Sequence, residues 1–193
     1  GVRNSAFGFS GQKCSAASRC VVVDPEGPGG ARTRQFVARL VEASRAMTLG
    51  DPREPRTDIG PVIDADAAAK IRSMVDIARR EHAEMGGCDE ALALEGLELP
   101  EGWNGHRTED GGSVAPRSVI GPHVFANVRP EHTLAREEVF GPVLAVMHAA
   151  TFDEALSVAT GRAYRLTGGV FTRLPRHIGR AKREFRVGNL DIN

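Results

Sequence analysis

The alternation of short apolar runs with segments of helical periodicity most constrains how this chain can fold. Apolar residues crowd into short runs that are typical of buried strands, and between these runs they recur every three to four residues, as on one face of a helix. Because parallel strands need crossover connections, this order predicts an α/β fold with an open, largely parallel sheet flanked by helices. Strands are expected over residues 19–23, 143–147, 169–172 and 187–192, with further strand signals near 119–120 and 124–125, and helices over 31–48, 64–85, 152–159 and 175–185.

Residues suited to helix ends support two of these boundaries. Asp64 or Asp66 can cap the second helix, since a side-chain oxygen there accepts a hydrogen bond from a free backbone N–H group, and Gly86–Gly87 can end it. Thr151 or Asp153 can cap the third helix in the same way. These two helices therefore have a chemical reason to begin where their apolar patterns begin.

Residues 88–115 show no sustained period and break the alternation. They carry several acidic residues together with Gly, Pro and the sole tryptophan, Trp103. A loop of this length is uncommon in a compact domain and is usually functional or mobile. We therefore expect a surface excursion over residues 88–115.

The composition excludes several classes of protein. The 193 residues carry 25 Lys and Arg against 25 Asp and Glu, so the net charge is zero, whereas a general nucleic-acid binder usually carries a basic excess. No stretch approaches the roughly 18 consecutive apolar residues of a membrane helix. The three cysteines are an odd number, which argues against a disulfide scaffold and favours a reducing, cytoplasmic setting. We expect no partnership with nucleic acid or membrane.

The segment Gly11–Ala16 is the first candidate for chemistry, because it holds Cys14 among small residues. A cysteine nucleophile needs neighbours that favour the thiolate, and small residues let a substrate and backbone N–H groups approach it. The alternative is that Cys14 is inert packing, which is the commoner fate of a buried cysteine. Cys20 lies inside an apolar run and is expected in the core. Cys88 lies at the start of the aperiodic segment and is expected to be incidental, with no role in the core or in chemistry.

The segment 137–142 is the second candidate, with Glu138 and Phe140 separated by one residue. A carboxylate beside an aromatic ring could bind a ribose diol and pack a flat ring, although a solvated loop entering a strand explains the same residues.

The six histidines are scattered and match no zinc pattern, so we expect no metal site. Basic residues outnumber acidic ones from 162 to 193, and we interpret them as a solvated helix face.

Read together and in order, these segments resemble the aldehyde dehydrogenase superfamily. Its active-cysteine signature resembles the stretch from Phe9 to Arg19, and its second signature resembles the stretch from Glu137 to Val143, about 120 residues later. Three further segments fit in family order: Gly50–Pro52 with Thr57–Ile63, Leu166–Thr172, and Gly188–Asn193. The resemblance covers nearly the whole chain apart from the expected excursion.

The finer pattern around Cys14 is similar to the delta-1-pyrroline-5-carboxylate dehydrogenase branch, which oxidises L-glutamate gamma-semialdehyde to glutamate with NAD. The resemblance implies that Cys14 attacks the aldehyde and that the neighbouring Ser15 contacts the substrate carboxylate. It also implies that Glu138 binds the nicotinamide ribose and that Phe140 positions the nicotinamide end. The partners it implies are a small aldehyde substrate and further copies of the parent protein in a homo-oligomer.

The resemblance also implies what lies outside the chain. Residues 1–193 match the cysteine-bearing catalytic domain, truncated at both ends, whereas the family's cofactor-binding domain precedes the cysteine and is absent here. On this interpretation the parent protein is the enzyme and the isolated chain is inactive. Two alternatives remain open: a non-catalytic fragment or degenerate binding module, and an aldehyde dehydrogenase of another substrate branch.

Overall fold

A mixed four-stranded sheet forms the centre of the computed structural model, which describes residues 1–93, 106–107, 113–114 and 118–193. The strand order is β1-β6-β5-β2, and both pairs among the first three strands are parallel. The fourth strand, β2, pairs antiparallel with β5. These strands are β1 (Arg19–Val23), β6 (Val143–Ala149), β5 (His123–Val128) and β2 (Asp89–Ala93). The expected α/β fold with a largely parallel sheet is confirmed.

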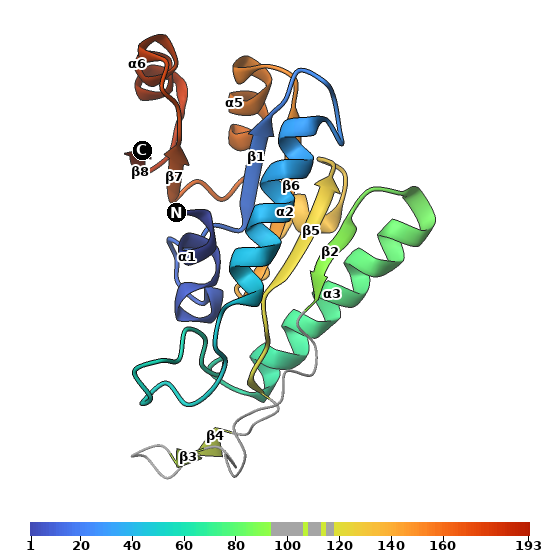
Figure 1. Cartoon of the computed structure of the whole chain (residues 1–193), viewed down its shortest axis with the longest axis vertical. Coiled ribbons are helices and arrows are strands. Elements are labelled where there is room, and N and C mark those ends of the chain that lie inside the picture. The colour runs from blue at the N-terminus through green and yellow to red at the C-terminus, as the bar shows by residue number, and fades with distance from the viewer. Residues whose placement is uncertain (94–105, 108–112, 115–117) are drawn as a thin grey trace.

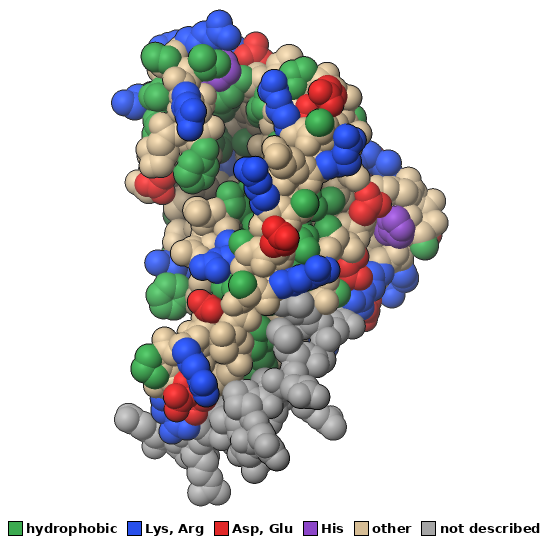
Figure 2. All heavy atoms as spheres, viewed as in Figure 1, with side chains coloured by type: hydrophobic (Ala, Val, Ile, Leu, Met, Phe, Trp, Pro, Cys, Tyr) green, Lys and Arg blue, Asp and Glu red, His purple; other side chains and the backbone are tan. Residues whose placement is uncertain are grey.

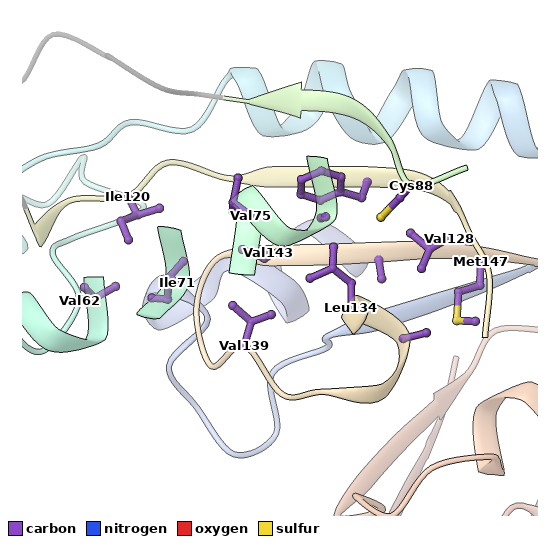
Figure 3. Packing of buried hydrophobic residues seen from close by; sticks show 14 of the residues in the cluster. Val62, Ile71, Val75, Cys88, Ile120, Val128, Leu134, Val139, Val143 and Met147 are labelled. Carbon is purple, nitrogen blue, oxygen red and sulfur yellow. The ribbon is translucent and has the colours of Figure 1, made fainter. Parts of the chain in front are cut away.

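Side chains of the central strand β6 alternate between two hydrophobic clusters, because successive residues of a strand point to opposite faces. Val143, Ala145 and Met147 belong to one cluster (Figure 3), and Leu144 and Val146 belong to the other. Almost every residue of β6 is buried, which is typical of a parallel strand covered on both faces. The continuous apolar run in the sequence is thus explained by two cores rather than one.

Helices cover both faces of this sheet (Figure 1). One cluster combines strand residues with α1 (Val2–Phe7) and α2 (Ala31–Arg45). The other takes residues from α3 (Ala65–Met85) and α4 (Thr133–Arg136), and Val158 of α5 (Phe152–Thr160) packs against it. The result is a three-layer arrangement of helices, sheet and helices.

Two of the expected helix caps are present. The Asp64 carboxylate accepts a hydrogen bond from Ala67 N at 2.7 Å, and Gly86, at φ 68°, ends α3. The Thr151 hydroxyl accepts from Glu154 N at 3.1 Å at the start of α5. In each pair of candidates the first residue, Asp64 or Thr151, is the cap.

The last part of the chain forms a separate unit. The strands β7 (Thr167–Val170) and β8 (Asn189–Ile192) pair in parallel as a two-stranded sheet, joined by α6 (Pro175–Glu184). In Figure 1 this unit lies beside the main sheet, near the N-terminus. Both strands and the helix occur close to where they were expected, although β7 begins two residues earlier.

Basic and acidic side chains are interspersed over the face of the molecule shown in Figure 2.

The expected surface excursion over 88–115 is wrong for its first residues. Asp89–Ala93 form β2, whose Leu92 is 3% exposed, and the Cys88 side chain is fully buried in the cluster of α3 and β5. Cys88 is therefore a core residue, not an incidental one. A two-residue pair, β3 (His106–Arg107) with β4 (Ser113–Val114), also falls in this segment. The rest of it, including Trp103, lies outside the described residues. Residues 119–120 are not in a strand.

Candidate active site

Cys14 lies in a tight turn between α1 and β1. A short 3-10 helix, η1 (Gly8–Gly11), precedes it, and three consecutive residues there adopt left-handed backbone conformations: Phe9, Ser10 and Gly11, with φ of 54°, 56° and 67°. Two of the three are not glycine, so the surrounding structure must hold them in place. The Ser10 hydroxyl, which is buried, donates to Gly60 O at 2.8 Å. That bond fixes the start of the turn.

Further hydrogen bonds tie the same turn to distant segments. Gln12 Oε1 accepts from Ile63 N at 2.8 Å, so the segment 57–63 is held against the turn at two points. At the other end, Ser18 O accepts from Ala145 N of β6 at 3.0 Å. The Cys14 turn is thus anchored on both sides and connected directly to the central strand.

The turn meets the second candidate segment at Gly11. A Cβ added to Gly11 would lie against the carbonyl group of Gly141 and 2.8 Å from Pro142 N, so only glycine permits this approach. On its other side, Gly141 is equally crowded: a Cβ there would lie 2.5 Å from Ile71 Cδ1 of α3. The two motifs, far apart in the sequence, are therefore in backbone contact.

The segment that carries Glu138 and Phe140 is fixed from the core. Val139 is 4% exposed and points into the hydrophobic cluster in Figure 3, so its neighbours Glu138 and Phe140 face outward. The Glu81 carboxylate of α3 accepts from Thr133 N at 3.0 Å and from Thr133 Oγ1 at 2.6 Å, which holds α4 immediately before this segment. Phe140 has φ 57° and is 40% exposed.

A small surface pocket lies where the two segments meet. Gly11, Lys13 and Ala16 line it from the Cys14 turn, and Glu138 and Phe140 line it from the other segment. The Cys14 and Ser15 side chains are exposed in the same turn but are not among the residues that line this pocket. The structure thus places Glu138 and Phe140 at the pocket, whereas Cys14 and Ser15 lie exposed in the adjoining turn.

Free backbone donors accompany the thiol. Across the described part of the chain, no oxygen accepts a hydrogen bond from the N–H group of Cys14 or of Ser15, whereas their neighbour Ala16 N donates to Lys13 O at 2.8 Å. Free N–H groups beside a nucleophile are the usual means of stabilising an oxyanion. The turn therefore offers an exposed thiol and, beside it, backbone donors suited to hold negative charge.

The three cysteines are unpaired and differ sharply in their surroundings. Burial raises the pKa of Cys20 to about 12. Burial also raises the pKa of Cys88 to about 12, and the negative charges of Glu81, Asp89 and Glu90 act in the same direction. A thiol with so high a pKa is a poor nucleophile at neutral pH. Cys14 is the exposed thiol.

Four residues that hold the site together were given no role by the sequence. They are Ser10, Gln12, Ser18 and Arg162, whose Nη1 donates to Ser18 Oγ at 3.1 Å. Gln12 belongs to the first motif, which was its only signal. The hydrogen bond between Arg162 and Ser18 links positions 144 apart in the chain, and no local pattern predicts such a contact.

Comparison with known proteins decides the family. The family model described as "Aldehyde dehydrogenase family" matches residues 1–193. The chain belongs to this family. Its resemblance to aldehyde dehydrogenases, inferred from the ordered motifs, is confirmed.

Relatives within the aldehyde dehydrogenase family carry more specific names. The chain is 38% identical over 189 residues to the 1-pyrroline-5-carboxylate dehydrogenase of Geobacillus kaustophilus, covering 98% of this chain and 31% of the relative. It is 39% identical over 190 residues to the enzyme of that name from Bacillus pumilus, with the same two coverages. The chain thus spans about a third of the length of these relatives.

Solved structures of the family share the fold. The 1-pyrroline-5-carboxylate dehydrogenase from Thermus with bound NAD superposes with a TM-score of 0.79 at 35% identity, covering 100% of this chain and 32% of that chain. Proline utilization A from Bdellovibrio bacteriovorus gives a TM-score of 0.78 at 37% identity, covering 100% of this chain and 17% of that one.

The residues at the pocket fit a nicotinamide cofactor of this family. Glu138 offers an exposed carboxylate, which can accept two hydrogen bonds from a vicinal diol. Phe140 presents a half-exposed ring against which a flat heterocycle can pack. The described ranges contain no group of three or more His, Cys, Asp or Glu placed to hold an ion. Within those ranges there is also no helix long and apolar enough to cross a bilayer.

Proposed function

We propose that this chain is the cysteine-bearing part of an NAD-dependent dehydrogenase that oxidises L-glutamate gamma-semialdehyde to glutamate. The close approach of Gly11 to Gly141 carries the proposal, because it brings the turn with the exposed Cys14 thiol against the segment that carries Glu138 and Phe140, which line the pocket at this junction. The names and NAD-bound state of similar proteins support the substrate and the cofactor. Since the chain spans about a third of those proteins, the activity belongs to the complete natural protein.

Cys14 is the nucleophile in this proposal. Its thiolate attacks the aldehyde carbon and forms a C–S bond, while the carbonyl π electrons move to oxygen and give a thiohemiacetal oxyanion. The free N–H groups of Cys14 and Ser15 point to the stabilisation of that oxyanion by charge-assisted hydrogen bonds. Loss of hydride from this carbon leaves a thioester, and water then releases the carboxylic acid and restores the thiol.

Glu138 and Phe140 hold the cofactor in this proposal. The Glu138 carboxylate accepts hydrogen bonds from the nicotinamide ribose, and the Phe140 ring limits where the nicotinamide can lie. The buried Val139 between them keeps both side chains facing outward. NAD, when bound, supplies the hydride acceptor.

Ser15 is the substrate-contacting residue in this proposal. Its hydroxyl is exposed next to Cys14 and can donate to the carboxylate at the far end of the semialdehyde.

Three free thiols fit a reducing compartment, and we place the protein in the cytoplasm.

The test measures NADH formation by the complete natural protein with L-glutamate gamma-semialdehyde, supplied in equilibrium with 1-pyrroline-5-carboxylate. We expect turnover, and we expect Cys14→Ala to lower kcat by more than about 1,000-fold. Cys20→Ala is the matched control, because it removes a thiol of strand β1 that is not in the Cys14 turn, and it is expected to keep the activity. Full activity of the Cys14 variant would refute the mechanism.

The same assay separates the alternatives. Turnover of other aldehydes without turnover of this semialdehyde would assign the protein to another substrate branch. A chain that reduces no NAD and forms no acyl adduct at Cys14 with 4-nitrophenyl acetate would be a non-catalytic module. The acyl adduct is measured by mass spectrometry, and it tests the nucleophile independently of the cofactor.

A further inference from the structure

Glu81, near the end of α3, fixes the start of α4. Its carboxylate accepts hydrogen bonds from Thr133 N at 3.0 Å and from Thr133 Oγ1 at 2.6 Å. Thr133 is the first residue of α4, and the first N–H groups of a helix have no partner within the helix itself. A side chain of another helix therefore supplies the missing acceptor. Because this acceptor is charged, its hydrogen bonds are among the stronger ones in proteins.

The turn before α4 is fastened to the same end of α3. His132 is fully buried, and its Nδ1 accepts from Arg129 N at 2.8 Å, so the proton is on Nε2, which donates to Gly86 O at 3.1 Å. Arg129 Nη2 donates to Met85 O at 3.0 Å. Met85 is the last residue of α3, and Gly86 ends the helix. Together with Glu81, these contacts hold the entry to α4 against α3.

The hydrophobic core holds α4 and the residue beyond it. Leu134 and Val139 are buried in the cluster that includes residues of α3 (Figure 3). Between them, Glu137 N donates to Thr133 O at 2.8 Å at the end of α4. Apolar burial is non-directional, whereas the hydrogen bonds of Glu81 have a defined geometry. The placement of this segment along α3 therefore depends on Glu81.

Glu138 lies between two points at which α3 locates the chain. Glu81 holds the chain at Thr133, and Ile71 limits it at Gly141, where an added Cβ would lie 2.5 Å from Ile71 Cδ1. These two positions on α3 are about 15 Å apart along the helix axis. The Glu138 side chain itself is exposed. Its place at the pocket is thus set by contacts on either side of it in the chain.

We propose that Glu81 is a positioning residue that sets the Glu138 carboxylate for binding NAD, acting through Thr133 and α4. The inference rests on the proposed function for its consequence, a higher affinity for NAD, whereas the ordering of residues 134–141 by Glu81 can be measured without cofactor. Removal of the carboxylate leaves two donors of Thr133 without their acceptor. The Cys14 turn is anchored on other segments, so its reactivity is expected to be independent of Glu81.

The first experiment measures amide hydrogen exchange by mass spectrometry in the complete natural protein without NAD. Glu81→Ala is expected to speed exchange of the peptide that covers residues 134–141 by about tenfold, because one anchor of this segment is lost. The matched control is Glu84→Ala, which removes the same charge from an exposed position of α3 and should leave that peptide unchanged. Glu81→Gln keeps an acceptor oxygen and should restore part of the protection.

Two results of this measurement would overturn the inference. One is equal exchange of residues 134–141 in Glu81→Ala and in the wild type. The other is faster exchange spread over the whole central sheet, because Glu81 would then stabilise the fold in general rather than position one segment.

The second experiment measures the Kd for NAD of the complete natural protein by isothermal titration calorimetry. Glu81→Ala is expected to raise this Kd roughly fivefold, and Glu81→Gln to restore part of the loss. Glu84→Ala should leave the Kd unchanged, and acylation of Cys14 by 4-nitrophenyl acetate should proceed at the wild-type rate in every variant. A merely structural role would slow acylation as well. An unchanged Kd in Glu81→Ala, when Glu138→Ala does raise it, would overturn the inference.

The double variant tests whether Glu81 acts through Glu138. In the Glu138→Ala background, Glu81→Ala is expected to add little to the Kd for NAD, since two changes that act through one group are not additive. Fully additive effects would overturn the inference. An unchanged Kd in Glu138→Ala alone would refute the proposed role of Glu138 and its consequence for NAD, while hydrogen exchange would still decide whether Glu81 orders residues 134–141.

Discussion

The backbone of Gly11 packs directly against the carbonyl group of Gly141, with no room for a side chain between them. This contact joins the turn that carries Cys14 to the segment that carries Glu138 and Phe140. Since Gly11 also has φ 67°, two independent requirements select glycine there. The pocket exists because these two segments can approach so closely.

Replacement of Gly11 by alanine tests this contact. A methyl group would overlap Gly141, and the residue would be held in a left-handed conformation, so we expect Gly11→Ala to lower the free energy of unfolding by about 2–4 kcal/mol. Gly8→Ala is the control, because Gly8 has φ −55° and its Cβ would meet no atom within 4 Å. That variant should unfold within about 1 kcal/mol of the wild type. Equal losses in urea denaturation would contradict the packing argument.

The three cysteines should react at very different rates with iodoacetamide. We expect Cys14 to be alkylated in the native protein, because it is exposed. Cys20 and Cys88 should react only on unfolding, since burial raises the pKa of each from 9.0 to about 12 and lowers the thiolate fraction by roughly a thousand-fold. Peptide mapping by mass spectrometry at pH 8 measures this order. Rapid native labelling of Cys88 would contradict its place in the core.

Asp24 should make stability depend on pH. It is fully buried, and its Oδ2 accepts from Thr33 N at 2.9 Å and from Thr33 Oγ1 at 3.1 Å in the first turn of α2. The hydrogen bond from Thr33 N is the main reason why the pKa of Asp24 lies below its ordinary value. A depressed folded-state pKa stabilises the fold above the unfolded-state pKa of about 3.9, and that contribution is lost as the pH falls through the folded-state value.

Asp24→Asn should therefore lower Tm at pH 7, and the difference from wild type should shrink as the pH is lowered below about 4. Thermal melts followed by circular dichroism across this range measure the difference. The control is Asp66→Asn on the exposed first turn of α3, which should change Tm little at any pH. A constant difference between Asp24→Asn and wild type at all pH values would argue against the role of its charge.

Gln12 should affect the site more than the fold. Gln12→Ala removes the acceptor for Ile63 N and should cost about 1 kcal/mol of stability. Because the same bond holds the Cys14 turn, we also expect slower acylation of Cys14 by 4-nitrophenyl acetate. Gln12→Glu keeps an acceptor oxygen and should preserve both properties. Release of 4-nitrophenolate measures the rate, and an unchanged rate in Gln12→Ala would show that this bond does not shape the turn.

The sequence predicted the elements whose local pattern is strong. The run from Val143 to Met147 is continuous and apolar, and it forms the central strand β6. Asp64 and Thr151 cap α3 and α5 because their side chains satisfy nearby N–H groups, which is a local property. Such features depend on neighbours in the chain, so the chain alone reveals them.

Features that depend on distant partners were missed. The strand β2 begins with two acidic residues, Asp89 and Glu90, and its pairing with β5 is irregular before Leu92, so no regular alternation reveals it. The pairing of β7 with β8 as a separate sheet follows from tertiary contacts that periodicity does not encode. In the candidate site, the motifs pointed to Cys14 and Glu138, whereas no local pattern pointed to the hydrogen bond between Arg162 and Ser18.

Gly141 lies between Gly11 of the Cys14 turn and Ile71 of the hydrophobic core, so the core packs directly beneath the candidate site. Ile71 belongs to α3, is 1% exposed and packs in the cluster that α3 forms with the central strands. Its volume sets how far the backbone at Gly141 can recede, and so how closely the Cys14 turn approaches the segment 138–142. A larger or smaller side chain at Ile71 would therefore shift the backbone of Gly141, and with it the segment that carries Glu138 and Phe140.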